Sequence, residues 1–180
     1  MDMYRLKYAY VQNKPISDSV NMPKRIATKP IDKEWENAVK RMWWYHENTD
    51  LPCEASPCIF ELRTRLLSLG GHNVCLPVSE PDLDNILERG QLWYGDIAKK
   101  VAGLPSQCHF NSAHLAKKTL GMMLCTGYAL SDDGLWRQHS WCVSKTGKKL
   151  SIVETTTKRV AYFGFVLNDD ETKTFCELNI

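Results

Sequence analysis

Four strand-like segments in the last third of the chain constrain its fold more than any other feature. The sequences Asp132-Asp133-Gly134 and Lys145-Thr146-Gly147-Lys148, which lie between the first three of them, are typical of tight turns. Segments joined in this way pair most economically with their neighbours in the chain. We therefore predict consecutive antiparallel strands at residues 122–130, 137–144, 149–154 and 159–167.

Apolar residues recur at helical spacing in the preceding part of the chain. Asp32 can cap a first helix, and its apolar stripe is expected in the core: Trp35, Val39, Met42 and Trp43. Further helices are predicted at residues 56–69, closed by Gly70-Gly71, at 81–88, stopped by Gly90, and at 108–120, stopped by Gly121. This order predicts an α+β fold in which N-terminal helices and a cysteine-bearing helix pack on an antiparallel sheet.

The first thirty residues differ from the rest. Aromatic and aliphatic residues alternate with other residue types at positions 4–10, which is the pattern of a half-buried strand. Residues 12–30 are polar and contain three prolines, so we expect a loop or arm there. The predicted organisation is an N-terminal strand and polar arm, 1–30, followed by a single α+β domain, 31–180, long enough to bury a core.

Composition limits the partners and the compartment. The net charge of +2 in 180 residues gives no general reason to expect nucleic acid or an anionic membrane. No apolar run approaches the roughly 18 residues that span a bilayer, and the first residues lack the pattern of a signal peptide. The seven cysteines are odd in number and scattered, which favours free thiols in a reducing compartment. We therefore expect a cytoplasmic protein without membrane contact.

Cys108 stands where the helix predicted at 108–120 begins. A thiol is a nucleophile as its thiolate, and a helix N-terminus lowers the thiol pKa. His139 lies in a predicted strand and Glu154 ends the next one, so antiparallel pairing can place both beside the start of a packed helix. A nucleophile, a base and an orienting carboxylate form a catalytic triad. Taken singly, each of these residues is more often structural.

A longer run of residues carries this pattern: Cys108, Gly127-Tyr128-Ala129, His139-Ser140-Trp141, Val153-Glu154-Thr155 and Tyr162-Phe163-Gly164. The run resembles the core of the transglutaminase-like cysteine hydrolases, within the wider papain-like group. It covers about residues 103–166, with 31 residues from the cysteine to the histidine and 15 from the histidine to the acid. Two positions depart from the family pattern, because Glu154 replaces the usual Asp and Thr155 the usual Pro.

The resemblance implies a hydrolase or acyltransferase that acts on an amide of a peptide, a protein or a small molecule. Protease, amidase, deamidase and transglutaminase activities all use this chemistry. Cys108 would attack the carbonyl, His139 would carry the proton, and Glu154 would hold the imidazole tautomer. No cofactor is expected.

Further residues are expected to line the site. The oxyanion would be met by the Cys108 N–H and a second donor, for which Gln107 and the Trp93 indole are candidates. Trp141 is expected to pack beside His139, as a wall against water or as plain core. Asn111, one turn after Cys108, is expected to hydrogen-bond into the site or to pack there.

Two other histidines compete for the role of the base. On a helix that begins at Cys108, His109 points about 100° away from the thiol, and His114 lies nearly two turns further on. His139 is therefore the preferred base.

Two alternatives remain open. Cys53, Cys58, His72 and Cys75 are ligand types of a structural zinc site, but their loose spacing and the intervening helix favour free thiols. The second alternative is a non-catalytic effector or inhibitor-like domain that binds a protein on a degenerate fold. The unassigned N-terminal part and its basic arm, PKRIATKP, fit that class, and the arm shows no nucleic-acid-binding motif.

Overall fold

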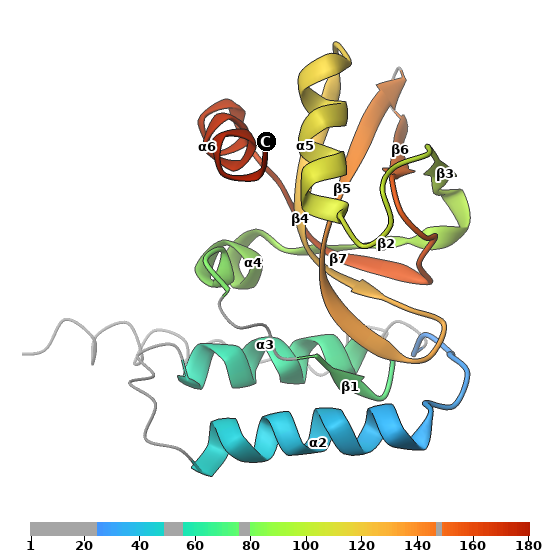
Figure 1. Cartoon of the computed structure of the whole chain (residues 1–180), viewed down its shortest axis with the longest axis vertical. Helices are drawn as coiled ribbons and strands as arrows, with labels where there is room; N and C mark the ends of the chain where they lie inside the picture. Colours follow the sequence, from blue (N-terminus) through green and yellow to red (C-terminus); the bar gives the residue numbers. More distant parts are fainter. Residues whose placement is uncertain (1–24, 49–55, 76–79, 147–148) are drawn as a thin grey trace, which may run out of the picture.

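The computed structural model describes residues 25–48, 56–75, 80–146 and 149–180 (Figure 1). Its helices are α2 (Lys33–Asn48), α3 (Ser56–Leu69), α4 (Leu83–Arg89), α5 (Cys108–Lys118) and α6 (Asp169–Asn179), with a 3-10 turn, η1, at Gly95–Ile97. Its strands are β1 (Asn73–Val74), β2 (Gln91–Tyr94), β3 (Lys99–Lys100), β4 (Met122–Leu130), β5 (Leu135–Thr146), β6 (Lys149–Glu154) and β7 (Ala161–Val166). The predicted α+β class is confirmed.

The sheet is mixed, with the strand order β2-β7-β4-β5-β6-β3 and with β1 beside β5. Strands β4, β5 and β6 pair antiparallel in succession, as predicted. The prediction is wrong for the last strand, because β7 pairs with β4 and β2 instead of β6. Strand β3 pairs in parallel with the edge of β6 that β7 was expected to occupy. Strand β7 instead pairs with the edge of β4 that β5 leaves open.

The sheet is curled. Strands β2 and β3 stand at opposite ends of the strand order, yet only η1 separates them in the chain, so the two edges lie close together. Curling gives the sheet an inner face, which is filled by one small cluster of apolar residues. Its fully buried members include Cys125, Trp141, Val143 and Tyr162.

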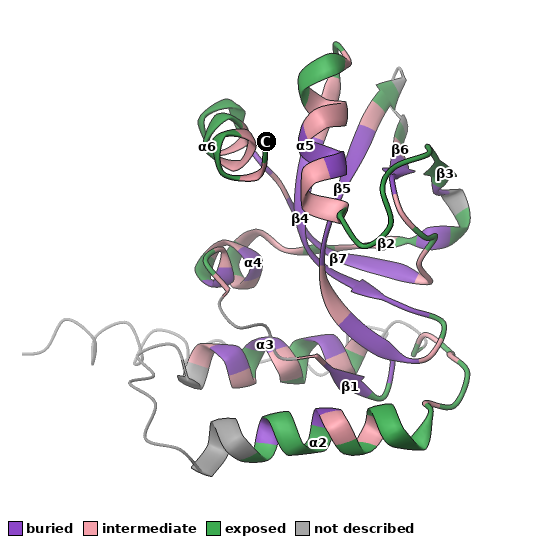
Figure 2. Cartoon of the chain, in the orientation of Figure 1, coloured by how far each residue is buried: buried purple, intermediate pink, exposed green. Residues whose placement is uncertain are grey.

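The outer face carries the larger core and the helices. Residues of α2, α3 and α4 pack there with Trp136, Leu130 and Phe165 of the sheet. Helices α5 and α6 lie side by side at the other end (Figure 1). Figure 2 shows the central strands buried, while much of the surface of α2 is exposed.

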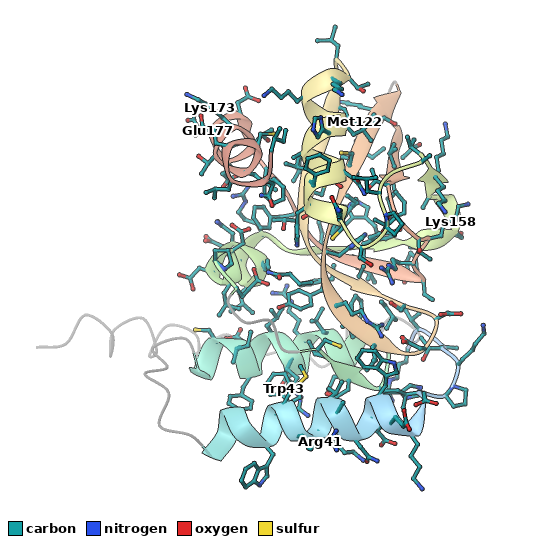
Figure 3. All side chains as sticks on the ribbon, viewed as in Figure 1. Arg41, Trp43, Met122, Lys158, Lys173 and Glu177 are labelled. Atoms are coloured by element: carbon teal, nitrogen blue, oxygen red, sulfur yellow. The ribbon has the colours of Figure 1, made fainter. Side chains whose placement is uncertain are left out.

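The stripe predicted on α2 is only half correct. Val39 and Trp43 are buried, and Trp43 points toward α3 (Figure 3) and donates from Nε1 to the Val74 carbonyl at 2.7 Å. Trp35 and Met42 are exposed, at 54% and 36%. Helix α2 lies at the margin of the fold, so a single narrow strip of its surface meets other elements.

The end of the predicted polar arm packs on the rest of the protein. Ile26 forms a parallel bridge with Gly70, and Lys29 makes a 2.8 Å ion pair with Asp132 in the β4–β5 turn. The strand predicted at residues 4–10 lies outside the described residues. Within the described part of the chain, none of the helices combines the length and the apolar character needed to cross a bilayer.

Candidate active site

Three hydrogen bonds fasten α5 to the middle of β5. Ser112 Oγ donates to the Ser140 carbonyl at 3.0 Å, and the Cys142 thiol donates to the Ser112 carbonyl at 3.3 Å. A further bond of 2.7 Å joins His109 Nδ1 and Ser140 Oγ. Because Ser140 follows His139, these bonds hold the first turns of α5 beside the segment of β5 that carries His139.

Cys108 is the first residue of α5. The residue before it, Gln107, occupies the cap position, and its side chain makes no capping hydrogen bond. Burial disfavours the Cys108 thiolate, but His139 and the backbone N–H groups of Ser140 and His109 outweigh this cost, so the pKa of Cys108 is lowered. Cys108 therefore has the environment of a reactive thiol.

His139 lies between Cys108 and Glu154. Its Nε2 atom is 2.9 Å from Glu154 Oε2, and the two side chains are 2% and 0% exposed. Cys108 is the second side chain that interacts with this imidazole. Burial opposes the imidazolium, but hydrogen bonds and charge from Cys108 and Glu154 prevail and raise the pKa of His139. His139 thus interacts with both the Cys108 thiol and the Glu154 carboxylate.

Both Glu154 oxygens are fully engaged as acceptors. Oε2 accepts from His139 Nε2 and from the Tyr162 hydroxyl at 2.9 Å. Oε1 accepts from the backbone N–H and the hydroxyl of Thr156, at 2.8 and 2.9 Å. Burial alone would raise its pKa, but the interactions with His139, Thr156 and Tyr162 lower it to about 2. Glu154 is therefore an anion near neutral pH despite its burial.

Thr156 and Tyr162 were not assigned roles from the sequence. Thr156 is the middle residue of a three-threonine run, a signal that does not distinguish it from its neighbours. Tyr162 falls within the Tyr-Phe-Gly part of the motif, but its contact with Glu154 depends on β7 lying across the curled sheet. A sequence does not reveal a contact of that kind.

Aromatic rings surround His139 on the inner face. Trp141 is fully buried and stacks nearly parallel to the imidazole, with an interplanar angle of 15° and centroids 6.4 Å apart. Tyr162 packs against Trp141, and Trp93 of β2 meets Trp141 edge-on at 5.6 Å. In the structure, Trp93 therefore supports this wall, which keeps solvent from the far side of the imidazole.

Gln107 and Asn111, which were also expected to line the site, differ in burial and in their contacts. Gln107 is exposed at the surface. Asn111 is buried, and both polar atoms of its amide bind the backbone of Leu104: Oδ1 accepts from the N–H at 3.0 Å, and Nδ2 donates to the carbonyl at 2.7 Å. Asn111 thus ties the segment 101–107, which precedes α5, to the helix.

The rival histidines have other contacts. His109 bonds to Ser140, and burial, followed by the charge of His139, lowers the pKa of His109. The ring of His114 packs on Phe110 with centroids 4.5 Å apart. His139 is the histidine whose hydrogen bond lowers the pKa of Cys108.

The zinc alternative has no counterpart in the part of the chain that the structure describes, where no three or more His, Cys, Asp or Glu residues form a metal-binding group. Cys53 lies outside the described residues. His72 Nε2 is instead 3.1 Å from the Lys29 carbonyl and 3.3 Å from Thr28 Oγ1, so it ties the N-terminal segment down.

Comparison with protein-family models, with curated proteins and with solved structures gives no match to this chain.

Proposed function

We propose that this protein is a cysteine hydrolase or acyltransferase that attacks an amide through a triad of Cys108, His139 and Glu154. The observation that carries the proposal is the buried pair of His139 and Glu154, with Nε2 2.9 Å from Oε2, next to the half-buried Cys108 thiol, whose pKa His139 lowers. A helix-borne cysteine beside a curled sheet is also the arrangement expected of a transglutaminase-like or papain-like core, and we assign the chain to that kind of fold.

The reaction follows from the positions of these groups. The Cys108 sulfur attacks the carbonyl carbon, and the thiol proton resides on His139 as part of the ion pair. As the carbon–nitrogen bond breaks, His139 returns the proton to the leaving amine and an acyl-thioester remains. Water, deprotonated by His139, then gives an acid, whereas an amine gives a new amide. Hydrolysis and transfer therefore share the first step.

The oxyanion of the intermediate needs hydrogen-bond donors near Cys108. We assign the first to the backbone N–H of Cys108, because no side chain caps the first turn of α5. Glu154 keeps the imidazole oriented and compensates its positive charge. Trp141 limits the access of water to this ion pair.

Alkylation of the thiols by iodoacetamide tests the proposal without a known substrate. We expect one fast-reacting thiol, located at Cys108 by peptide mapping, with a rate midpoint below the ordinary thiol pKa of about 8.5. The variant Cys108→Ala should lose this reaction. Cys176→Ala is the matched control, because Cys176 is also half-buried in a helix, but burial raises its pKa.

An activated ester such as p-nitrophenyl acetate tests the covalent step. The protein should release nitrophenol and form an acetyl-thioester at Cys108, and added amine should compete with water for it. Uniformly slow alkylation of all thiols, with no thioester, would contradict the proposal and favour the non-catalytic binding domain.

A further inference from the structure

A pocket of about 180 Å³ lies on the flank of α5 beside the proposed active site. Its walls come from three places: residues 101–103, the α5 residues Asn111, His114, Leu115 and Lys118, and Thr155, which follows β6. These walls connect it to the triad, since Thr155 follows Glu154 and Asn111 lies one turn after Cys108. The triad itself does not use the pocket.

Thr155 gives the pocket an unsatisfied polar group. The residue is 2% exposed, and its Oγ1 atom has no hydrogen-bond partner in the described part of the chain. A buried hydroxyl without a partner costs free energy, which a ligand oxygen would recover after a rotation of the Thr155 side chain turns the hydroxyl into the pocket. His114 and Lys118 of α5 add two nitrogen groups to the lining. The polar groups of the pocket therefore suit an oxygen-rich, anionic ligand.

The sequence segments around the pocket are rich in positively charged residues, which also suits an anionic ligand. Residues 98–131 contain four lysines and no Asp or Glu, and residues 138–166 contain four lysines and Arg159 against one carboxylate, the buried Glu154. Lys99 and Lys100 lie opposite Val153 and Glu154 in the β3–β6 pairing, and Lys158 lies on the same side (Figure 3). In sequence, the exposed acid closest to the pocket residues is Asp96 of η1, five positions before Val101.

The other flank of α5 differs. Helix α6 lies there, and its first turn carries Asp169, Asp170 and Glu171 (Figure 1). The whole chain has a net charge of only +2, whereas residues 98–131 and 138–166 together hold nine Lys and Arg residues against the single, buried Glu154. Such a local field attracts anionic groups to the site.

We propose that this pocket binds an acidic side chain of a peptide substrate, close to the amide that Cys108 attacks; the inference rests on the proposed function. A helix rises about 1.5 Å per residue, which places His114 about 9 Å and Lys118 about 15 Å along the axis from Cys108. An extended peptide advances about 3.3 Å per residue, so the acidic side chain stands two to five residues from the scissile amide. An acidic peptide is favoured over nucleic acid, because it carries the amide that the thiol needs.

Peptides with a central epoxysuccinyl group, flanked by residues on both sides, test the inference by alkylating Cys108. The peptides are made in pairs. One member of each pair carries Asp at a single position, from the second to the fifth of either arm, and the other member carries Asn at the same position. We expect one Asp peptide to react about tenfold faster than its Asn partner at low ionic strength, and the ratio to fall toward one at high salt. Lys118→Gln should reduce the ratio, whereas Lys173→Gln, which removes a lysine from α6, should not.

The outcomes separate the two proposals. Equal rates for every Asp and Asn pair, with fast alkylation of Cys108 by iodoacetamide, overturn the acidic subsite and leave the triad intact. Slow alkylation of Cys108 by all reagents overturns the proposed function. If an oligonucleotide or phosphatidylserine vesicles at micromolar concentration abolish the Asp preference, the charged surface serves that partner and the peptide assignment is wrong.

Discussion

Replacing Glu154 by Gln tests the least conventional part of the proposed triad. The pKa of Glu154 is lowered from 4.5 to about 2, so the folded protein favours the carboxylate by about 3 kcal/mol. The interaction with His139 accounts for only part of this free energy. In the variant, the His139 imidazolium should therefore be less stable by about 1–3 kcal/mol, because the carboxylate no longer compensates its charge. The thiolate population of Cys108 at neutral pH should then fall by about 5- to 150-fold.

Glu154→Gln should also lower the free energy of unfolding, because the substitution disrupts the hydrogen bonds that the carboxylate accepts. Both Glu154 oxygens accept from donors, whereas a glutamine amide offers only one acceptor atom. Whichever way the amide turns, its NH₂ group faces either Thr156 or the pair of His139 and Tyr162. We expect the free energy of unfolding to fall by about 1–3 kcal/mol, with the fold retained.

The assay is the rate of Cys108 alkylation as a function of pH, together with urea unfolding of the same samples. For Glu154→Gln, the midpoint should move to higher pH and the rate at pH 7 should fall, but less than in Cys108→Ala. Glu171→Gln is the control, since Glu171 pairs with Arg89 on the opposite side of α5. A folded Glu154→Gln variant with the parental pH profile would refute the role of Glu154.

Three further predictions concern stability. The folded-state pKa of Glu154 is depressed, so its contribution to stability is present above its ordinary pKa of 4.5 and is lost as the pH falls from about 4.5 to below about 2, which urea midpoints at several pH values will measure. Tyr162→Phe removes one donor to Glu154, so it should cost about 1 kcal/mol and move the acid-induced loss to higher pH. Gly127→Ala should cost about 2 kcal/mol or more by thermal unfolding, because a Cβ there would lie 2.3 Å from the Phe163 carbonyl oxygen at a φ of 149°.

The elements that the sequence revealed are those with a strong local signal. Strand β4 and helix α3 have the predicted bounds, because apolar patterns and terminal glycines mark them. Strands β1 and β3 contain two residues each, too few for any periodicity. Helix α6 has no buried residue, and the half-buried Phe175 makes its contact with the core, so its apolar pattern is weak. Its signal is a capping box, in which Asn168 and Glu171 exchange hydrogen bonds with each other's backbone.

Long-range packing explains the remaining errors. The pairing of β7 with β4 depends on β3 covering the edge of β6, and β3 has no signal of its own. The contact of Tyr162 with Glu154 follows from that pairing and was equally hidden. Trp35 has the same spacing from Val39 as Val39 has from Trp43, so periodicity alone does not show that α2 leaves it exposed.

The sheet register gives a physical reason for a glutamate where the resemblance leads one to expect an aspartate. Cys142 pairs with Val153, so one step further Trp141 lies opposite Glu154, and His139 is two residues beyond on the same face. Such diagonal neighbours are about 7–8 Å apart at the backbone, whereas directly opposed residues are about 5 Å apart. The additional methylene of glutamate extends the carboxylate toward the imidazole, and Tyr162 and Thr156 then hold it there. The departure from the family pattern is thus compatible with a triad, because the longer side chain matches a diagonal placement.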